Sequence, residues 1–244
     1  MSAARHRLFV PPAQLGASEV TLTSGQARYL ETVLRLERGA EIEVFDGEGG
    51  LYRARLAAPG RLHIEDRMPQ QARAPDVVLA QALAKGEKFD VVVQKATELG
   101  AMRLLPLASE RAVVRLDEAR GQSRAERWRR IAEEAARQCG RADVPRIDPP
   151  CGWEGVFSLL RDDPGRRGLL LDPEERELRL GAAARGAPKL LLLVGPEGGF
   201  SPGERDRARA EGILPVALGP LVLRTETAGL AALAVVLHVH GELG

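Results

Sequence analysis

Residues 190–204 carry the sequence LLLLVGPEGGFSPGE, in which a strand, an irregular loop and the start of a helix follow one another. The aliphatic run 190–194 is typical of a parallel strand that is buried on both faces of a sheet. Ser201, Pro202 and Glu204 have the spacing of a helix capping box with proline at the first helical position. Strand, loop and helix in this order predict an α/β fold.

The same alternation extends over residues 71–244. Aliphatic runs predict further strands, and apolar residues at helical spacing predict helices. The strands are expected at 77–83, 104–107, 169–171 and 216–218, and the helices at 89–99, 124–139 and 227–239. Gly100 and Gly140 are placed to end the first two helices. We therefore predict one α/β domain with a mostly parallel sheet in this part of the chain.

Residues 1–70 have a different pattern, with short alternating segments that are typical of β-strands. Strands are expected at 42–46, 51–56 and 62–64, and a short helix at 25–36. The glycine-rich segment 47–50 predicts a hairpin turn, and Ser24 is a candidate cap for the helix. Together these features predict a small β-barrel-like domain, followed by a polar linker that contains two prolines.

The composition excludes several classes of protein. The chain has 244 residues, of which 44% are hydrophobic and 28% charged, and its formal net charge is +1. These values exclude disordered, fibrous and uniformly basic proteins. No apolar run of 18 residues is present, so we expect no membrane span, and residues 1–9 lack the apolar core of a secretory signal. We expect a cytoplasmic protein.

Metal chemistry has little support in the sequence. Cys139 and Cys151 are too few for a disulfide framework or for a four-ligand zinc site. His238 and His240 have no cysteine or acidic cluster beside them. We therefore expect reduced thiols and no bound metal.

The glycine loop after residue 194 has the features of a ligand site. Gly195, Gly198 and Gly199 let the backbone approach a ligand closely, and ligands of open α/β sheets bind beyond the carboxyl ends of strands. The loop matches neither a Walker A motif nor G-x-G-x-x-G, and Glu197 would repel a pyrophosphate. An uncharged or cationic ligand, such as an adenosine or a sulfonium, suits it better. The alternative is an ordinary strand-to-helix turn.

A second polar segment, 218–228, reads LGPLVLRTETA. Its glycine and proline predict an irregular backbone after a strand, and four polar residues then precede an apolar helix. Thr225 or Thr227 as a helix cap, with Glu226 at the positive end of the helix dipole, is the simplest explanation. That explanation does not cover Arg224, because an arginine buried beside the aliphatic run would need a partner. The two irregular loops are candidates for the two walls of one pocket.

Arginines gather in the middle of the chain. Only four of the 35 basic residues are lysines, which a coding bias explains, but residues 103–146 hold 11 arginines against 7 acidic residues. A solvated helix face with ion pairs to Glu126, Glu133 and Glu134 is one interpretation. Contact with RNA, together with the small β domain, is the other. Both remain open from the residues alone.

These segments together resemble the 16S ribosomal RNA uridine-N3 methyltransferases of the SPOUT class. The resemblance rests on the two loop motifs and, upstream and in order, on RHRLFV at 5–10, VLRLERG at 33–39 and KGEKFDVVVQKATELG at 85–100. It continues through the stretch that begins at Arg127-Trp128 and includes EEAARQCGRADVP, so it covers nearly the whole chain. Leu221 departs from it, since a basic residue is expected there.

The resemblance implies a PUA-like RNA-binding β-barrel over residues 1–70 and a C-terminal α/β trefoil-knot domain over 71–244. It also implies a homodimer that uses S-adenosyl-L-methionine, with 16S ribosomal RNA or the small ribosomal subunit as its partner. The implied cofactor-binding residues are Leu171, Gly195, Glu197, Gly198, Gly199, Leu218, Gly219, Leu223 and Thr227. RNA contacts are expected from Arg7, Arg35, Lys85, Lys95, Arg111, Arg137 and Arg141.

The target atom suggests roles for three residues. Uridine N3 must lose a weakly acidic proton before it can accept a methyl group. We expect Arg224 to stabilise the negative charge that spreads onto O2 and O4, and Glu226 or Glu197 to orient the base or accept the proton. The alternatives are a SPOUT enzyme with another target, such as a ribose 2′-hydroxyl, and an RNA-binding assembly factor without catalytic activity.

Overall fold

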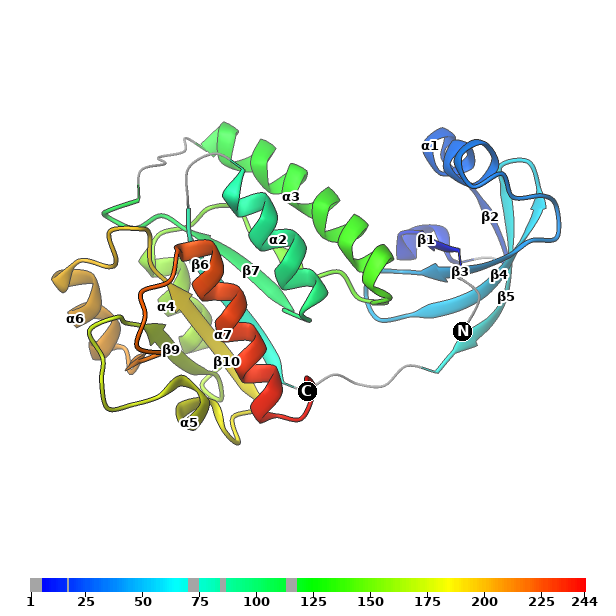
Figure 1. Ribbon diagram of the computed structural model, residues 1–244. Coiled ribbons are helices and arrows are strands. Elements are labelled where there is room, and N and C mark those ends of the chain that lie inside the picture. The colour runs from blue at the N-terminus through cyan, green and yellow to red at the C-terminus, as the bar shows by residue number, and fades with distance from the viewer. Residues whose placement is uncertain (1–5, 17, 70–74, 84–86, 113–117) are drawn as a thin grey trace. The chain divides into compact units, whose positions relative to one another are not determined.

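The computed structural model describes residues 6–16, 18–69, 75–83, 87–112 and 118–244 (Figure 1). The chain forms two compact units. The first comprises Met1–Ala72 with Glu133–Val144, and the second Arg73–Ala132 with Pro145–Gly244. The long helix α3, Glu118–Cys139, therefore has residues in both.

The first unit is built on a five-stranded sheet of order β1-β3-β4-β5-β2. Its strands are β1 Arg7–Phe9, β2 Glu19–Thr21, β3 Glu41–Phe45, β4 Leu51–Ala58 and β5 Arg61–Met68. The predicted hairpin is confirmed, because β3 and β4 pair antiparallel around residues 47–50. The strands β1 and β2 were not predicted, since each has three residues. The core gathers aliphatic side chains from the sheet and from the helical segment.

The helical segment of this unit begins one residue earlier than expected. Helix α1, Ser24–Arg28, is capped by the hydroxyl of Thr23, which accepts a hydrogen bond from the Gln26 amide at 3.3 Å. The Gln26 side chain accepts in return from the Thr23 amide, at 2.9 Å. The expectation that Ser24 is the cap is therefore wrong, because Thr23 has the matching glutamine three positions on. A wider turn, Tyr29–Val33, follows, and a short 3-10 turn, Pro12–Gln14, precedes β2.

The second unit confirms the predicted parallel α/β architecture. Its six-stranded sheet has the order β11-β9-β10-β6-β7-β8, and every strand pair in it is parallel. The strands are β6 Asp76–Ala82, β7 Arg103–Leu107, β8 Arg146–Ile147, β9 Arg167–Leu171, β10 Lys189–Val194 and β11 Leu214–Val216.

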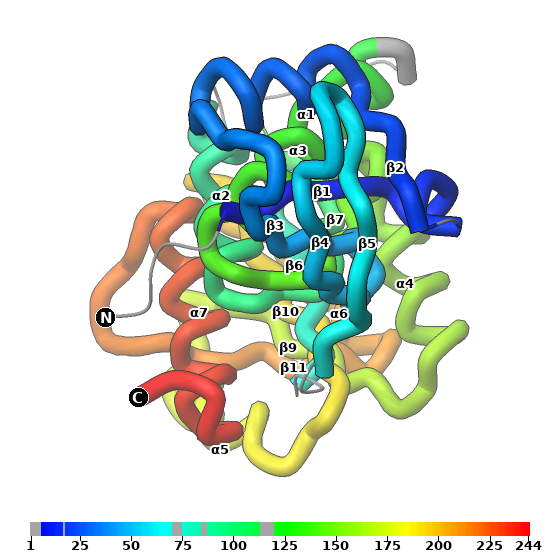
Figure 2. Tube along the Cα trace, turned by 90° about the vertical axis from the view of Figure 1, so that its right-hand side faces the viewer, coloured from blue at the N-terminus to red at the C-terminus, as the bar shows by residue number. Residues whose placement is uncertain are grey.

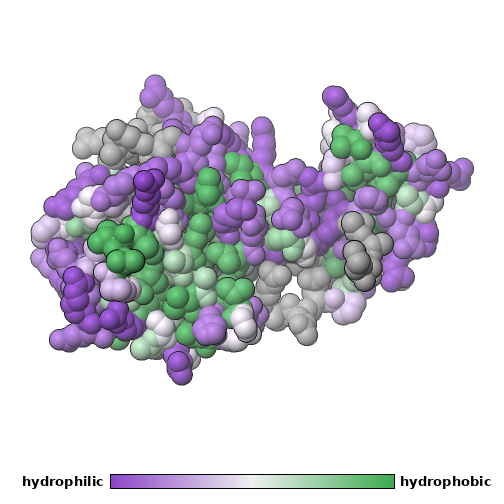
Figure 3. Space-filling view, viewed as in Figure 1, coloured by the Kyte–Doolittle hydropathy of each residue, from purple (hydrophilic) through white to green (hydrophobic). Residues whose placement is uncertain are grey.

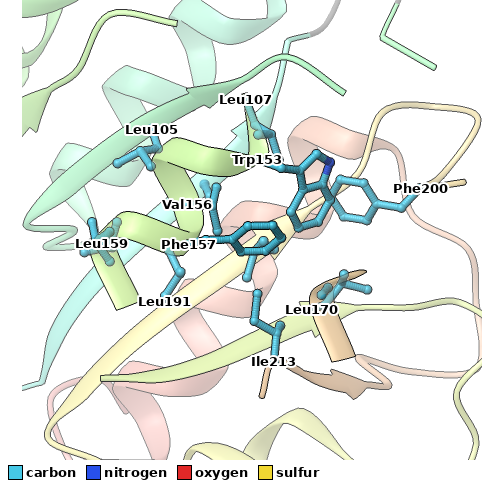
Figure 4. Close-up of a cluster of buried hydrophobic side chains, with 14 residues drawn as sticks. Leu105, Leu107, Trp153, Val156, Phe157, Leu159, Leu170, Leu191, Phe200 and Ile213 are labelled. Atoms are coloured by element: carbon cyan, nitrogen blue, oxygen red, sulfur yellow. The ribbon is translucent and has the colours of Figure 1, made fainter. Parts of the chain in front are cut away.

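Helices cover both faces of this sheet (Figure 1). They are α2 Lys88–Glu98, α4 Trp153–Asp162, α5 Leu180–Ala184, α6 Pro202–Ala210 and α7 Thr225–Val239. Helix α7 packs on β6 and β10 with α2 and α5 beside it, as Figures 1 and 2 both show. On the other face, Trp153 and Phe157 of α4 pack with Phe200 against the sheet (Figure 4). No helix within the described ranges is long and apolar enough to cross a membrane.

The chain that follows β11 passes between two earlier segments. The Asp172 amide, just after β9, donates to the carbonyl of Val216 at 3.0 Å. On its other side, Ala217 exchanges backbone hydrogen bonds of 2.8 and 2.9 Å with Leu178 and Leu180. The C-terminal segment thus lies between the end of β9 and the start of α5 before it turns into α7, which accords with the knot implied by the resemblance.

Candidate active site

The helix that follows the glycine loop begins as predicted. The Ser201 hydroxyl accepts from the Glu204 amide at 3.1 Å, the Glu204 carboxylate accepts from the Ser201 amide at 2.8 Å, and Pro202 holds the first helical position. Glu204 has no exposed surface, and its other oxygen accepts from the Trp153 indole and the Glu110 amide at 2.8 and 2.9 Å. Three donors therefore compensate for burying this carboxylate. They anchor the far end of the loop.

Each glycine of the loop has its own structural role. A Cβ on Gly195 would lie 3.2 Å from the Phe200 amide nitrogen, so a larger residue would need the backbone of residues 199–200 to shift by a few tenths of an ångström. Gly199 has a φ of +65°, which favours glycine. The carbonyl of Gly198 accepts a 2.8 Å hydrogen bond from the Arg111 guanidinium. Arg111, predicted as an RNA contact, therefore also holds the loop from outside.

The second loop meets the first through Thr225. Helix α7 starts at Thr225, and its N-cap residue, Arg224, makes no side-chain capping bond. A threonine cap is therefore wrong: the Thr225 hydroxyl instead donates to the Gly195 carbonyl at 2.6 Å, and Thr227 is exposed. The hydrogen bond of the Thr225 hydroxyl therefore joins the two irregular loops.

A buried glutamine that we did not predict supports this junction. Gln81, near the end of β6, is 1% exposed, and its amide nitrogen donates to the hydroxyl and the carbonyl of Thr225 at 2.6 and 3.2 Å. The sequence feature that could have pointed to Gln81 is that it is the one polar residue in the otherwise apolar run 77–83. The ends of β6 and β10 and the start of α7 are thereby linked.

One lysine lies between the two candidate carboxylates. The Lys88 ammonium is 3.0 Å from a carboxylate oxygen of Glu197 and 3.8 Å from one of Glu226. The Glu226 side chain is 20% exposed and that of Glu197 44%, so Glu226 is the more enclosed acid. Lys88 stands at the first position of α2, and its type alone did not single it out. The structure brings both predicted acids to one cation.

Arg224 is exposed, and so is the aliphatic run before it. Leu221, Val222 and Leu223 are 77%, 82% and 38% exposed. Because Arg224 is solvent-exposed, it does not need the partner that a buried arginine would need. Within the described residues no hydrogen bond or ion pair holds this guanidinium, and it is open to a ligand that carries developing negative charge.

The remaining predicted cofactor positions lie at the same edge of the sheet. Leu171 is the last residue of β9, while Leu218 and Gly219 follow β11; all three are half-buried. Together with the glycine loop after β10, these residues place the predicted cofactor positions at the carboxyl ends of β9, β10 and β11. Parallel sheets bind ligands at this edge.

Comparison with known proteins agrees with this geometry. A family model described as an RNA methyltransferase domain matches residues 71–237, and one described as an RNA methyltransferase PUA domain matches residues 22–65. The ribosomal RNA small subunit methyltransferase E of Synechocystis sp. is 37% identical over 235 residues, which cover 94% of this chain and 76% of that protein. The chain belongs to the ribosomal RNA small subunit methyltransferase E family.

Two further members of the methyltransferase E family show how much is shared. The protein of Bacillus subtilis is 30% identical over 90% of both chains. The crystal structure of the Neisseria gonorrhoeae protein bound to S-adenosyl methionine superposes with a TM-score of 0.85, at 30% identity, over 96% of this chain and 98% of that one. The N-terminal unit is accordingly a PUA domain, and the C-terminal unit has the parallel α/β fold of SPOUT methyltransferases.

Of the arginines expected to contact RNA in this methyltransferase, Arg141 is buried and Arg7 is half-buried. The Arg141 side chain has no exposed surface and forms an ion pair with Asp143. Arg7 donates to the Arg141 carbonyl at 3.1 Å and lies 3.4 Å from the Glu43 carboxylate. Both side chains form ion pairs within the PUA unit, and that of Arg141 has no accessible surface. Their contact with RNA stays a prediction.

The other expected RNA contacts are more accessible. Arg35 is exposed, and Lys95 is paired at 2.8 Å with Glu98. Arg137 lies over the Tyr29 ring at 4.3 Å and pairs with Glu134. Lys85 lies outside the described residues. We retain Arg35, Lys95, Arg111 and Arg137 as proposed contacts.

Cysteine chemistry has no support at Cys151. Burial raises the pKa of its thiol to about 11, and the nearby Asp148 carboxylate adds to that effect. A thiol with so high a pKa is a poor nucleophile near neutral pH.

Proposed function

We propose that this protein transfers a methyl group from S-adenosylmethionine to N3 of a uridine in 16S ribosomal RNA. The hydrogen bond from Thr225 to Gly195 carries the proposal, because it brings the two loop motifs into one site. The names of the relatives support ribosomal RNA of the small subunit as substrate, and the Neisseria structure supports the methyl donor. The choice of N3 rests on the resemblance of the two motifs.

The residues of this edge suit a cationic adenosine ligand. A Cβ on Gly199 or Gly219 would meet no atom within 4 Å, so space for a ligand lies against the backbone there. The nearby Lys88 ammonium is 3.0 Å from the Glu197 carboxylate, so it is not an unpaired cation of the kind that a pyrophosphate site needs. The residues proposed to hold the cofactor are Leu171, Gly195, Glu197, Gly198, Gly199, Leu218, Gly219, Leu223 and Thr227. When bound, S-adenosylmethionine supplies the electrophilic methyl group.

The chain's own residues supply charge stabilisation and proton transfer. Arg224 lies at the start of α7, where its exposed guanidinium donates to O2 or O4 of the uracil as negative charge develops. Glu226 follows two positions later, and its enclosed oxygen has no hydrogen-bond partner in the described part of the chain. We assign the N3 proton to Glu226 because its contact with the same Lys88 ammonium is longer, at 3.8 Å, than the 3.0 Å hydrogen bond of Glu197.

A homodimer is the assembly that the surface supports. Helix α7 is apolar on nearly all sides, yet the sheet buries only part of it. Figure 3 shows apolar surface over α7 and beside it. The half-buried apolar residues of this helix are Ala228, Leu230, Ala231, Ala234, Val235, Leu237 and Val239. A contiguous apolar patch of this kind marks an interface, and a second copy is the partner implied by the resemblance.

Methylation by the purified protein tests the proposal. Small subunits that lack the modification are incubated with the protein and methyl-labelled S-adenosylmethionine, and the labelled nucleoside is identified by mass spectrometry. Label in 3-methyluridine is the expected result. Label in a 2′-O-methyl nucleoside would assign another SPOUT activity, and RNA binding without any label would favour a non-catalytic assembly factor.

A further inference from the structure

A chain of three hydrogen bonds crosses the carboxyl edge of the second sheet. The Gln81 amide nitrogen, on β6, donates to the Thr225 hydroxyl and the Thr225 carbonyl at 2.6 and 3.2 Å. The Thr225 hydroxyl donates to the Gly195 carbonyl, after β10, at 2.6 Å. Residues 81 and 225 are 144 positions apart in the chain. The network therefore joins three segments that only the fold brings together.

The acceptors in this network determine which amide atom faces Thr225. The Thr225 hydroxyl has one proton, and the Gly195 carbonyl receives it. The hydroxyl oxygen can then only accept, as the Thr225 carbonyl does, and the Gln81 amide supplies N–H donors to both. A glutamate at this position would place a second acceptor against them. The network therefore needs a donor at residue 81, which glutamine supplies and an ionised glutamate does not.

Two locally unfavourable features accompany Gln81. Its carbonyl oxygen is buried and has no hydrogen-bond partner in the described part of the chain, and a buried acceptor without a partner lowers stability. Gly229, inside α7, lies directly against it: a Cβ there would be 2.4 Å from this oxygen. Glycine inside a helix is also unfavourable. An aliphatic residue at 81 would avoid the first of these costs, so stability alone does not account for glutamine here.

We infer that Gln81 is a positioning residue for the methyl-donor site. It orients the Thr225 hydroxyl, which holds the Gly195 carbonyl, and it thereby sets the separation of the glycine loop from the start of α7. The inference rests on the proposed function, in which Gly195 and Thr227 belong to the cofactor site. Gln81 acts through Thr225 and does not itself contact the cofactor.

The test separates cofactor affinity from stability. S-adenosylmethionine binding is measured by calorimetry, and unfolding by thermal denaturation, on the full chain. Gln81→Glu, which has nearly the same shape, is expected to weaken binding at least tenfold. Gln81→Leu also removes the unpartnered oxygen, so it is expected to unfold within a few degrees of wild type while it too binds at least tenfold more weakly. A purely structural role would not produce weak binding with stability retained.

Thr225 provides the second half of the test. Thr225→Val is expected to weaken binding as Gln81→Leu does, and the double variant to bind no more weakly than either single one, because both changes break the same network. Thr225→Ser keeps the hydroxyl and is expected to retain affinity within about twofold. Additive losses in the double variant would overturn the inference.

Thr97→Val is the matched control. Thr97 is buried in α2 and its hydroxyl donates to the Val93 carbonyl at 2.7 Å, so the change removes a buried hydrogen bond from the same unit outside the network. Its affinity for S-adenosylmethionine is expected to equal that of wild type. If Gln81→Glu and Gln81→Leu bind S-adenosylmethionine as tightly as wild type, the inference is overturned but the proposed function is not. The same holds if Thr97→Val weakens binding as much as the Gln81 variants do. A wild-type protein that does not bind S-adenosylmethionine would contradict the proposed function itself.

Discussion

Arg224 is the residue to which the proposed mechanism assigns most of the charge stabilisation. Its guanidinium is exposed at the first turn of α7, so removing it changes little in the fold. We expect Arg224→Ala to lower the rate of methyl transfer by about a hundredfold or more, which is the usual effect of removing a donor to a developing negative charge. Methyl-transfer assays and calorimetry check this together, because affinity for S-adenosylmethionine should stay within about twofold.

Arg209→Ala provides the control for Arg224→Ala. Arg209 is also exposed, but it lies in the last turn of α6 and pairs with Asp206 at 3.2 Å. Its replacement should leave the turnover unchanged. Equal turnover of the Arg224→Ala variant and wild type would remove Arg224 from the mechanism.

Cys151 allows a test of burial by its chemistry. Its pKa of about 11, against an ordinary value of 9.0, leaves about one hundredth of the usual thiolate at pH 8. In a Cys139→Ser background, iodoacetamide should therefore modify the native protein about a hundredfold more slowly than the protein unfolded in urea. Because the folded pKa is the higher one, the unfolded chain loses this proton first, and the free energy of unfolding should fall from pH 9 to pH 11. Equal labelling rates would contradict the burial of this thiol.

Gln81 and Lys88 show why part of the site could not be predicted. Both act through partners more than a hundred positions away, Thr225 and Glu197, and no local pattern encodes those pairs. Arg224, Glu197 and Glu226 could be predicted because they lie in or directly after loops whose glycines and prolines are visible in the sequence. Whether these three carry out the chemistry stays a prediction.

At the scale of elements, local signals predicted the structure well where they were strong. The run 190–194 became the buried strand β10, and Ser201 caps α6 as its spacing with Glu204 indicates. The strands β1 and β8 have three and two residues and are stabilised by pairing with β3 and β7, which no local pattern reveals. Thr225 was misjudged as a cap because a tertiary acceptor, the Gly195 carbonyl, competes for its hydroxyl.

The capping box of α6 makes a stability prediction. Ser201 is buried and satisfies the Glu204 amide, so Ser201→Ala should lower the free energy of unfolding by about 1–2 kcal/mol. Thermal unfolding followed by circular dichroism should show a transition several degrees lower. Ser158→Ala, in which the lost hydroxyl contacts Asp162 at 3.4 Å on the surface of α4, should unfold like wild type. Indistinguishable transitions of the two variants would show that the box contributes nothing.

At the scale of the whole molecule, the apolar surface of α7 predicts self-association. Light scattering coupled to gel filtration should give twice the mass of one 26.4 kDa chain. Val235→Glu places a charge on this surface and should shift the protein toward the monomer, whereas Val91→Glu changes an exposed valine of α2 and provides the comparison. A wild-type monomer at micromolar concentration would contradict the proposed homodimer.

The path of the chain is the property of the molecule least open to prediction from its sequence. The residues indicated strands and helices in the right order, but the passage of residues 216–217 between the ends of β9 and α5 depends on contacts among three distant segments. The net charge of +1 likewise gives no sign that arginines are concentrated over residues 103–146. Family resemblance supplied what periodicity and composition could not.

Nucleoside mass spectrometry of 16S ribosomal RNA from a strain that lacks this protein tests the proposed activity most directly. We predict that 3-methyluridine disappears from that RNA, that the wild-type protein restores it and that the Arg224→Ala variant does not. Undiminished 3-methyluridine in the deletion strain would contradict the proposed function.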